Sequence, residues 1–330
     1  MIASSVAVLG AGSWGTAVAR HIANSGKHVF LWARDKQHVQ DMVAERCNQR
    51  YLPQVPFPPQ LEPIADLAHC VSQATEIIIA VPSHAFASLL TKLPKPAHGL
   101  SWITKGIDPS THKLLSELVA EQWGSDYPMT VISGPSFAKE VARGLPTALV
   151  IAGNNAPYQQ SIRTLLHDKN MRVYLSNDLT GVQLCGAVKN ILAIACGISD
   201  GLHYGANAKA ALITRGLAEM SRLGLCLGAR PDTFMGLAGV GDLVLTCTDD
   251  QSRNRRFGLQ LGQGVDPISA EKNIGQVVEG KHNAAQICAL AMQHNVEMPI
   301  CEEVNALLQG KHTLKKAVAN LLNRPPREEF

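Results

Sequence analysis

The stretch VAVLGAGSWG at residues 6–15 decides the fold of the first half of this chain. It joins an apolar run, which predicts a buried strand, to a Gly-x-Gly-x-x-Gly turn made by Gly10, Gly12 and Gly15. In such a turn the first glycine permits a tight bend, the second lets the backbone approach a pyrophosphate, and the third lets the next helix pack on the strand. Because a helix N-terminus presents free N–H groups to phosphates, we predict a dinucleotide-binding turn.

Strand-like and helix-like patterns alternate from this turn to about residue 174. The expected strands cover residues 6–10, 28–32, 76–81, 100–104, 129–133, 148–152 and 172–174. The expected helices cover residues 14–24, 36–46, 84–90, 113–122, 137–143 and 157–166. Since apolar strands that alternate with helices are typical of doubly wound sheets, we predict a Rossmann-like, mostly parallel sheet. The proline-rich stretch from Pro53 to Pro63 is expected to be an irregular connection.

The second half of the chain has a different character. Strand patterns stop near residue 177, and helical patterns follow at residues 179–198, 208–223, 253–261, 281–294 and 302–308. A chain of 330 residues is long enough for about two domains. We therefore predict an α/β protein with a dinucleotide-binding Rossmann domain at 1–176 and an all-helical substrate-binding domain at 177–330. A frayed tail is expected from residue 325.

Composition limits the classes of function. The net charge is only +3 and the basic residues are scattered, so we predict no nucleic-acid partner. The eight cysteines form no CxxC pair and have no histidine at metal-ligand spacing, which predicts reduced, mostly buried thiols and no metal. The sequence shows no run of about 18 apolar residues and no charged leader before the apolar start. We therefore expect a cytoplasmic protein without membrane insertion.

The end of the second expected strand bears on the choice of cofactor. NAD enzymes usually place an acid there to hold the ribose 2′-hydroxyl, whereas Trp32 and Ala33 occupy this region and Arg34 follows. A guanidinium suits a 2′-phosphate, so NADP is favoured over NAD, which stays possible. Arg34 as a solvated charge is the alternative. Asp35 is expected to cap the next helix.

Two lysines lie in unusual settings. Lys105 follows an apolar strand, at the edge where open α/β sheets bind ligands, although an exposed loop lysine fits the pattern too. Lys189 is the only charge in the helical stretch GAVKNILAIACG at 186–197, so it either extends its amine to solvent or has a function. Such a lysine is a candidate for proton transfer.

Three further segments carry candidate polar groups. Gly134 and Ser136 follow a strand in SGPSF, and Ser136 suits the N-cap of a short helix. Ser252 also suits an N-cap, yet Arg253, Arg255 and Arg256 follow it in the first turn, where cations oppose the helix dipole. A bound phosphate explains such a choice, and a solvated basic patch is the alternative. In the glycine-rich segment before it, Asp242 either holds a lysine or a substrate hydroxyl, or begins a helix.

Four segments of this chain resemble bacterial NAD(P)-dependent glycerol-3-phosphate dehydrogenases. They are GAGSWGTA at 10–17, SGPSFAKE at 133–140, GAVKNILAIACGISDGLHYGANAKAALITRG at 186–216 and GLAGVGDLVLTCTDDQSRNRRFG at 236–258. The resemblance implies interconversion of sn-glycerol 3-phosphate and dihydroxyacetone phosphate in the phospholipid precursor pathway. It also implies a helical domain like the C-terminal domain of 6-phosphogluconate dehydrogenase. The apolar, small-residue helices favour a homodimer.

The resemblance also assigns roles to individual residues. It makes Lys189 the acceptor of the C2 hydroxyl proton and places Lys105 near both substrate and cofactor. The other substrate contacts that it implies are Gly134, Ser136, Asp242, Ser252, Arg253 and Asn254. The cofactor contacts that it implies, beside the three glycines of the turn, are Ser13, Trp14, Arg34, Lys105, Ala138, Arg253, Val277 and Glu279.

Two alternatives compete with this interpretation. One is another dehydrogenase of the same two-domain architecture, such as a ketopantoate or sugar-acid enzyme. The Ser252–Asn254 set argues against it, because a carboxylate substrate needs fewer such groups. The other is a non-catalytic NADP-binding sensor, which has no reason to keep Lys105, Lys189 and Asp242 together.

Overall fold

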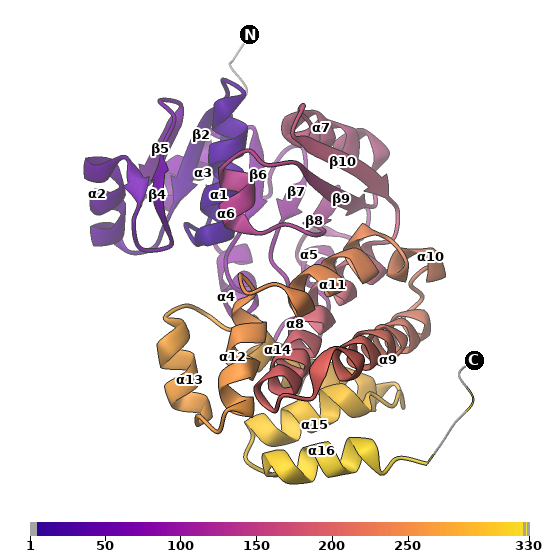
Figure 1. The fold of residues 1–330 in the computed structure, drawn as a ribbon. Coiled ribbons are helices and arrows are strands. Elements are labelled where there is room, and N and C mark those ends of the chain that lie inside the picture. Colours follow the sequence, from indigo (N-terminus) through magenta and orange to yellow (C-terminus); the bar gives the residue numbers. More distant parts are fainter. Residues whose placement is uncertain (1–4, 326–327, 329–330) are drawn as a thin grey trace. The chain divides into compact units, whose positions relative to one another are not determined.

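The computed structural model describes residues 5–325 and residue 328 and divides into two compact units. The first unit comprises the described residues up to Asp108 together with Lys113–Gln183, and the second comprises Pro109–His112 and the described residues from Leu184 onward. Figure 1 shows a sheet with helices in the first unit and helices alone in the second. The boundary predicted at 176/177 falls between the last strand, β10, and the long helix α8.

The sheet of the first unit has eight strands in the order β10-β9-β8-β7-β6-β1-β2-β5. Their bounds are β1 Ser5–Leu9, β2 His28–Trp32, β5 Leu61–Ile64, β6 Glu76–Ile79, β7 Leu100–Trp102, β8 Met129–Ser133, β9 Thr147–Gly153 and β10 Met171–Ser176. All neighbours pair in parallel except β8 and β9, which are antiparallel. The prediction of a mostly parallel, Rossmann-like sheet is therefore confirmed.

Seven helices accompany this sheet in the described part of the first unit. They are α1 Ser13–Asn24, α2 Lys36–Glu45, α3 Leu67–Gln73, α4 Ser83–Leu90, α5 Leu115–Trp123, α6 Ala138–Ala142 and α7 Ala156–Leu166. Apolar side chains of β1 and α1, such as Val6, Val8 and Ile22, are fully buried and form the core with β2 and β9. Asp35 caps α2 as predicted, because its carboxylate accepts from the N–H groups of Gln37 and His38.

The prediction of an irregular connection between Pro53 and Pro63 is wrong. This stretch contains β4, Leu52–Pro56, which pairs with β3, Cys47–Asn48, and the parallel strand β5. β5 is the last strand at one edge of the sheet. A proline is tolerated there because an edge strand has one side without ladder partners, so the missing N–H of Pro63 breaks no pairing.

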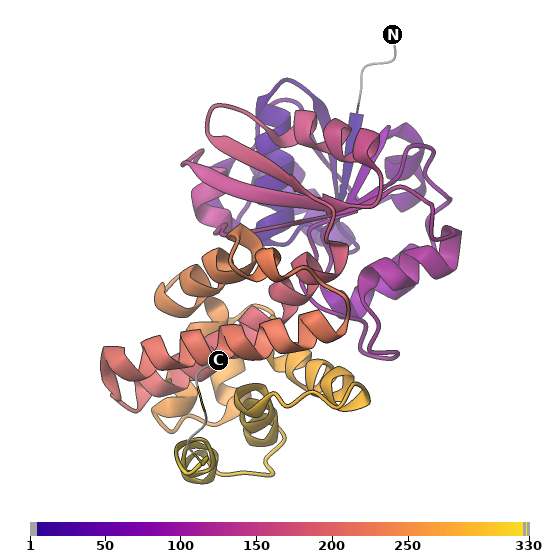
Figure 2. The ribbon, with the colours of Figure 1, turned by 90° about the vertical axis from the view of Figure 1, so that its right-hand side faces the viewer.

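The second unit is built from helices in its described residues, as predicted. Their bounds are α8 Leu179–Gly201, α9 Gly205–Cys226, α10 Pro231–Phe234, the π-turn η1 Leu237–Gly241, α11 Asp242–Thr248, α12 Arg253–Gly262, α13 Pro267–Ile274, α14 Glu279–Gln293, α15 Pro299–Leu308 and α16 Leu314–Leu322. Helices α15 and α16 lie side by side (Figure 1, Figure 2). The sequence missed α10, α11, α13 and α16 because they are short. Most of the expected tail lies outside the described residues.

Helix α8 is the core helix of this unit. Among the described helices it alone is long and apolar enough to meet a hydropathy criterion for a membrane span, but that apolar window is entirely buried in the protein. Burial on all sides explains why it is apolar all round. The eight cysteines are free, and most are buried, although Cys226 is exposed.

A buried carboxyl connects α9 to α15. Glu219 is 2% exposed and accepts from the backbone N–H groups of Ile300, at 2.7 Å, and Cys301, at 3.3 Å. These groups belong to the first turn of α15, which has no preceding turn to accept them. Burial raises the pKa of Glu219 to about 7 from 4.5, although the two N–H groups oppose that rise.

This carboxyl predicts a pH dependence of stability. The pKa of Glu219 is higher in the folded chain than in the unfolded chain. Its contribution to the free energy of unfolding is therefore complete below pH 4.5 and is lost as the pH rises through 7. A shift of this size corresponds to about 3 kcal/mol of unfolding free energy at most. We expect Glu219→Gln to flatten the stability profile between these pH values, measured by urea unfolding. Wild-type and variant profiles that run parallel would contradict this.

Candidate active site

The glycine turn after β1 is held by close backbone contacts. Gly10 has φ +133°, and a Cβ there would lie 2.7 Å from the carbonyl carbon of Ala80, at the end of β6. A Cβ at Gly15 would lie 2.0 Å from the oxygen of Gly10. Both positions therefore exclude any side chain, and α1 starts directly against the strands.

Gly12 is different, and its surroundings fit a dinucleotide. It occupies the N-cap position of α1 without a side-chain cap, and a Cβ there would meet nothing within 4 Å. The first N–H groups of the helix thus adjoin open space, as an approaching pyrophosphate requires. The buried Nε1 of Trp14 has no partner among the described residues, and the Ser13 hydroxyl donates to the Tyr51 carbonyl at 2.7 Å.

Three predicted residues meet where β7 and β8 end. The Lys105 amine donates to the Gly134 carbonyl at 3.3 Å, and the Ser136 hydroxyl donates to the same carbonyl at 2.9 Å. The strands before them are neighbours in the sheet, so their carboxyl ends carry these residues side by side. The prediction that Ser136 is an N-cap is wrong, because α6 begins at Ala138 and its N-cap residue is Phe137. The Ser136 hydroxyl donates to the Gly134 carbonyl and caps no helical N–H group.

Arg34 follows β2 at the same carboxyl edge of the sheet. It is exposed, and no hydrogen bond or ion pair of its side chain occurs with the described residues. A guanidinium in this state is available to an anionic ligand. The carboxylate of Asp35, the next residue, caps α2 and pairs with Arg50 at 3.4 Å.

The centre of the helical unit is a buried lysine and its two partners. Lys189 on α8 is 6% exposed, and its Nζ lies 2.5 Å from Oδ1 of Asp242. The same Nζ donates to the Thr246 hydroxyl at 2.9 Å. Asp242 is the first residue of α11 and Thr246 lies one turn further along that helix. Asp242 therefore both begins a helix and holds the lysine, two options that the sequence had left open.

Burial of this lysine has an electrostatic consequence. A buried ammonium is costly unless it is paired, and the carboxylate of Asp242, 1% exposed, supplies the compensating charge. The sequence had not singled out Thr246. The signal available was its position four residues after Asp242, which places both side chains on one face of a helix.

The first turn of α12 adjoins the lysine. Ser252 caps it as predicted, since its hydroxyl accepts from the N–H of Arg255 at 3.2 Å. The Asn254 side chain donates to that of Asn190, the residue after Lys189, at 2.9 Å. It also accepts from the N–H of Gly280 at 2.9 Å. Asn190 was not recognised from the sequence, although it is the neighbour of the candidate base.

Arg253 and Glu279 form a second pair of charges near this turn. The guanidinium of Arg253 donates to the Gln276 side chain at 3.2 Å, and burial lowers its pKa. Burial raises the pKa of Glu279 to about 7, and the charge of Arg253 opposes that rise. Oε2 of Glu279 is buried without a partner among the described residues. Val277 precedes Glu279, which is the first residue of α14. An arginine at a capped helix N-terminus suits a phosphate group.

The three arginines of α12 do not share one role. Arg255 is 9% exposed and pairs with Asp250 and, at 2.5 Å, with Asp200. The expectation that the basic first turn as a whole serves a phosphate is therefore wrong for Arg255, because two carboxylates already neutralise it. Arg256 is exposed.

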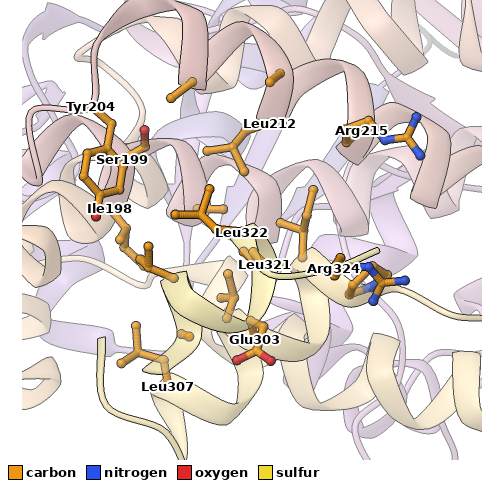
Figure 3. Close-up of a pocket in the computed structure, with 18 of the residues that line it drawn as sticks. Ile198, Ser199, Tyr204, Leu212, Arg215, Glu303, Leu307, Leu321, Leu322 and Arg324 are labelled. Atoms are coloured by element: carbon orange, nitrogen blue, oxygen red, sulfur yellow. The ribbon is translucent and has the colours of Figure 1, made fainter. Parts of the chain in front are cut away.

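A separate groove lies elsewhere in the helical unit. It has a volume of about 490 Å³ and is lined mainly by aliphatic residues of α8, α9, α15 and α16, with Arg215 and Arg324 among its few charged side chains (Figure 3). None of the predicted site residues lines it. The described residues also contain no group of histidine, cysteine and acidic side chains that would hold a metal ion.

The fold and these side chains define a class of protein. A Rossmann-like unit with a Gly-x-Gly-x-x-Gly turn, followed by a helical unit with a buried lysine beside a capped helix N-terminus, is typical of two-domain NAD(P)-dependent dehydrogenases. Models of the N-terminus and the C-terminus of NAD-dependent glycerol-3-phosphate dehydrogenase match residues 5–159 and 178–319. The chain belongs to this family, and it is an NAD(P)-dependent oxidoreductase of glycerol 3-phosphate.

Individual relatives agree with this assignment. The chain is 66% identical over 324 residues to glycerol-3-phosphate dehydrogenase [NAD(P)+] of Legionella pneumophila strain Paris, with 98% of each covered. It is 49% identical to the glycerol-3-phosphate dehydrogenase of Coxiella burnetii, whose crystal structure superposes with a TM-score of 0.95 over 98% of this chain and 100% of that one. A ketopantoate reductase from Ralstonia eutropha, at 16% identity and a TM-score of 0.60 over 95% and 99% of the two chains, shares the fold alone.

Proposed function

We propose that the chain interconverts sn-glycerol 3-phosphate and dihydroxyacetone phosphate and so supplies glycerol 3-phosphate for phospholipid synthesis. The observation that carries the proposal is the buried Lys189, held by Asp242 and Thr246 and adjoining the first turn of α12 through the Asn190–Asn254 hydrogen bond. This arrangement offers a proton-transfer group and an anion-binding group within one unit.

Lys189 is the proposed catalytic residue. A carbonyl that receives a hydride becomes an alkoxide, which an ammonium stabilises and then protonates. In the opposite direction a neutral lysine accepts the proton of the C2 hydroxyl. Asp242 and Thr246 fix the position of Nζ for both tasks. The nicotinamide cofactor supplies the hydride chemistry when it is bound.

The remaining contacts are proposed as follows. The substrate is bound by Ser252, Arg253, Asn254 and Asp242, together with Lys105, Gly134 and Ser136 of the first unit. The cofactor is bound by Gly10, Gly12, Ser13, Trp14, Gly15, Arg34, Lys105, Ala138, Arg253, Val277 and Glu279. The guanidinium of Arg253 and the helix N-terminus capped by Ser252 support binding of a substrate that carries a phosphomonoester. The proposed domains are 1–176 and 177–330.

An assay that combines two cofactors with two candidate substrates tests the proposed function. Purified protein is mixed with NADPH or NADH and with dihydroxyacetone phosphate or unphosphorylated dihydroxyacetone, and absorbance of the reduced cofactor is followed. We expect oxidation only with the phosphorylated substrate. Bound NADPH without oxidation would point to another substrate or to the sensor hypothesis.

Arg34 is expected to set the preference for NADPH. Because its side chain is exposed beyond the end of β2 and has no partner among the described residues, it is available to the 2′-phosphate. We expect Arg34→Ala to raise KM for NADPH about tenfold more than KM for NADH, as for one lost charge-assisted contact. Equal effects on both cofactors would mean that Arg34 does not contact the 2′-phosphate.

Two further properties are proposed. The free state of all eight cysteines supports a reducing, cytoplasmic location. The small-residue, apolar helices of the second unit support a homodimer, and sedimentation equilibrium of the purified chain measures its mass in solution.

A further inference from the structure

Helices α8 and α12 touch through their backbones. A Cβ at Gly258 of α12 would lie 2.1 Å from the Ile194 carbonyl oxygen of α8, and a Cβ at Gly197 of α8 would lie 2.0 Å from the Arg255 oxygen of α12. Gly201 and Gly262 repeat the contact one turn further along, each with a closest backbone oxygen at 2.4 Å. No side chain fits at these positions unless the two helices separate, so the glycines set the distance between the helix axes.

The backbone contact between α8 and α12 lies one helical turn from the candidate site. Gly258 follows Asn254 by one helical turn, and Ile194 follows Asn190 by one turn. Asn190 and Asn254 are joined by their side-chain hydrogen bond of 2.9 Å. The backbone contact and the buried hydrogen bond therefore hold the turn that carries the proton donor against the turn that carries the anion-binding residues.

An ion pair fixes the same two helices. Arg255, on α12, reaches Asp200 near the end of α8 at 2.5 Å, and Asp200 also pairs with Lys209 at 2.8 Å. Asp250, before α12, takes another nitrogen of the same guanidinium. A planar guanidinium can hold two carboxylates in a fixed direction, which an ammonium cannot do. Arg255 is thus a second restraint on the position of α12.

We propose that Gly258, Gly197 and Arg255 are positioning residues that fix the separation between Lys189 and the phosphate-binding turn of α12, and so select the spacing between carbonyl and phosphate in the substrate. This inference rests on the proposed function and adds the determinant of substrate length. Its physical basis is that a misplacement of about 1 Å can cost about 100-fold in rate.

The test compares dihydroxyacetone phosphate with its homologue that has one more methylene between carbonyl and phosphate, 4-hydroxy-3-oxobutyl phosphate. In Gly258→Ala the added methyl forces the helices apart. We expect kcat/KM for dihydroxyacetone phosphate to fall about 100-fold. The ratio of homologue to dihydroxyacetone phosphate should rise about tenfold, the discrimination that one methylene commonly provides.

A matched control separates positioning from general destabilisation. Gly224 lies on α9, where a Cβ would be 2.2 Å from the ring of Phe234. Gly224→Ala should lower the melting temperature and leave the ratio of the two substrates unchanged. If Gly258→Ala folds and loses activity equally on both substrates, or retains the wild-type values, the inference is overturned.

A milder variant keeps the test decisive if Gly258→Ala does not fold. Arg255→Lys retains the charge but replaces the two guanidinium nitrogens that pair with Asp200 and Asp250 by a single ammonium nitrogen, so the ratio should shift in the same direction by a smaller factor. A folded Arg255→Lys protein with the wild-type ratio overturns the inference. Failure of the proposed function itself is distinguishable, because wild-type protein would then not reduce dihydroxyacetone phosphate at all.

Discussion

Replacing Lys189 by alanine is expected to lower kcat about 10³-fold or more, within the range of lost general acid–base catalysis and charge stabilisation. The Nζ lost in this variant is the one that Asp242 and Thr246 hold in the helical unit. Lys189 is not among the residues that we assign to the cofactor, and the glycine turn assigned to it belongs to the other compact unit. NADPH binding, followed by fluorescence titration, should therefore be nearly unchanged.

The same substitution has an expected cost in stability. Asp242 is 1% exposed, so the substitution removes the cation that lies 2.5 Å from a buried carboxylate. Breaking such a pair typically costs about 3–5 kcal/mol. The double variant Lys189→Ala/Asp242→Ala should regain part of that stability without regaining turnover. A Lys189→Ala protein that turns over near the wild-type rate would remove Lys189 from the mechanism.

Alanine at Gly12 should weaken cofactor binding without changing stability, whereas alanine at Gly15 should lower the stability of the protein. A methyl at Gly12 meets nothing within 4 Å, and its φ of −75° suits alanine. It does, however, occupy the space at the start of α1 that a pyrophosphate would approach. We expect Gly12→Ala to keep the wild-type melting temperature and to raise the Kd for NADPH about 100-fold, equivalent to about 2.7 kcal/mol.

Gly15→Ala is the matched variant for this experiment. Its methyl would lie 2.0 Å from the Gly10 oxygen, so the turn or α1 must move. We expect a loss of about 3 kcal/mol in the free energy of unfolding, at the upper end of overpacking effects. Calorimetry and NADPH titration of both variants measure the two effects separately. Gly12→Ala protein with wild-type affinity would show that the cofactor does not approach this turn.

Local patterns were sufficient for much of the fold. The apolar run before Gly10, the glycine spacing and the alternation of strands with helices predicted the sheet, because these periods reflect burial on the two faces of each element. Errors concentrated in short or proline-containing segments. β5 was missed because a proline pattern argues against a strand, whereas the position of β5 at the sheet edge, which decides whether proline is tolerated, is a tertiary property.

The residues of the candidate site also fall into two groups, those that local sequence predicted and those that only tertiary packing brought together. The sequence by itself determined the glycine turn between a strand and a helix, the single lysine within an apolar helix and the cap at Ser252, since each depends on neighbouring residues only. The tertiary structure decided that Lys189 meets Asp242, 53 residues away, and that Asn254 meets Asn190, 64 residues away. It also decided that Arg255 meets Asp200, 55 residues away, so that a carboxylate from another helix neutralises it. Local periodicity indicates which face of a helix is buried, but the partner on that face is fixed only when the helices pack.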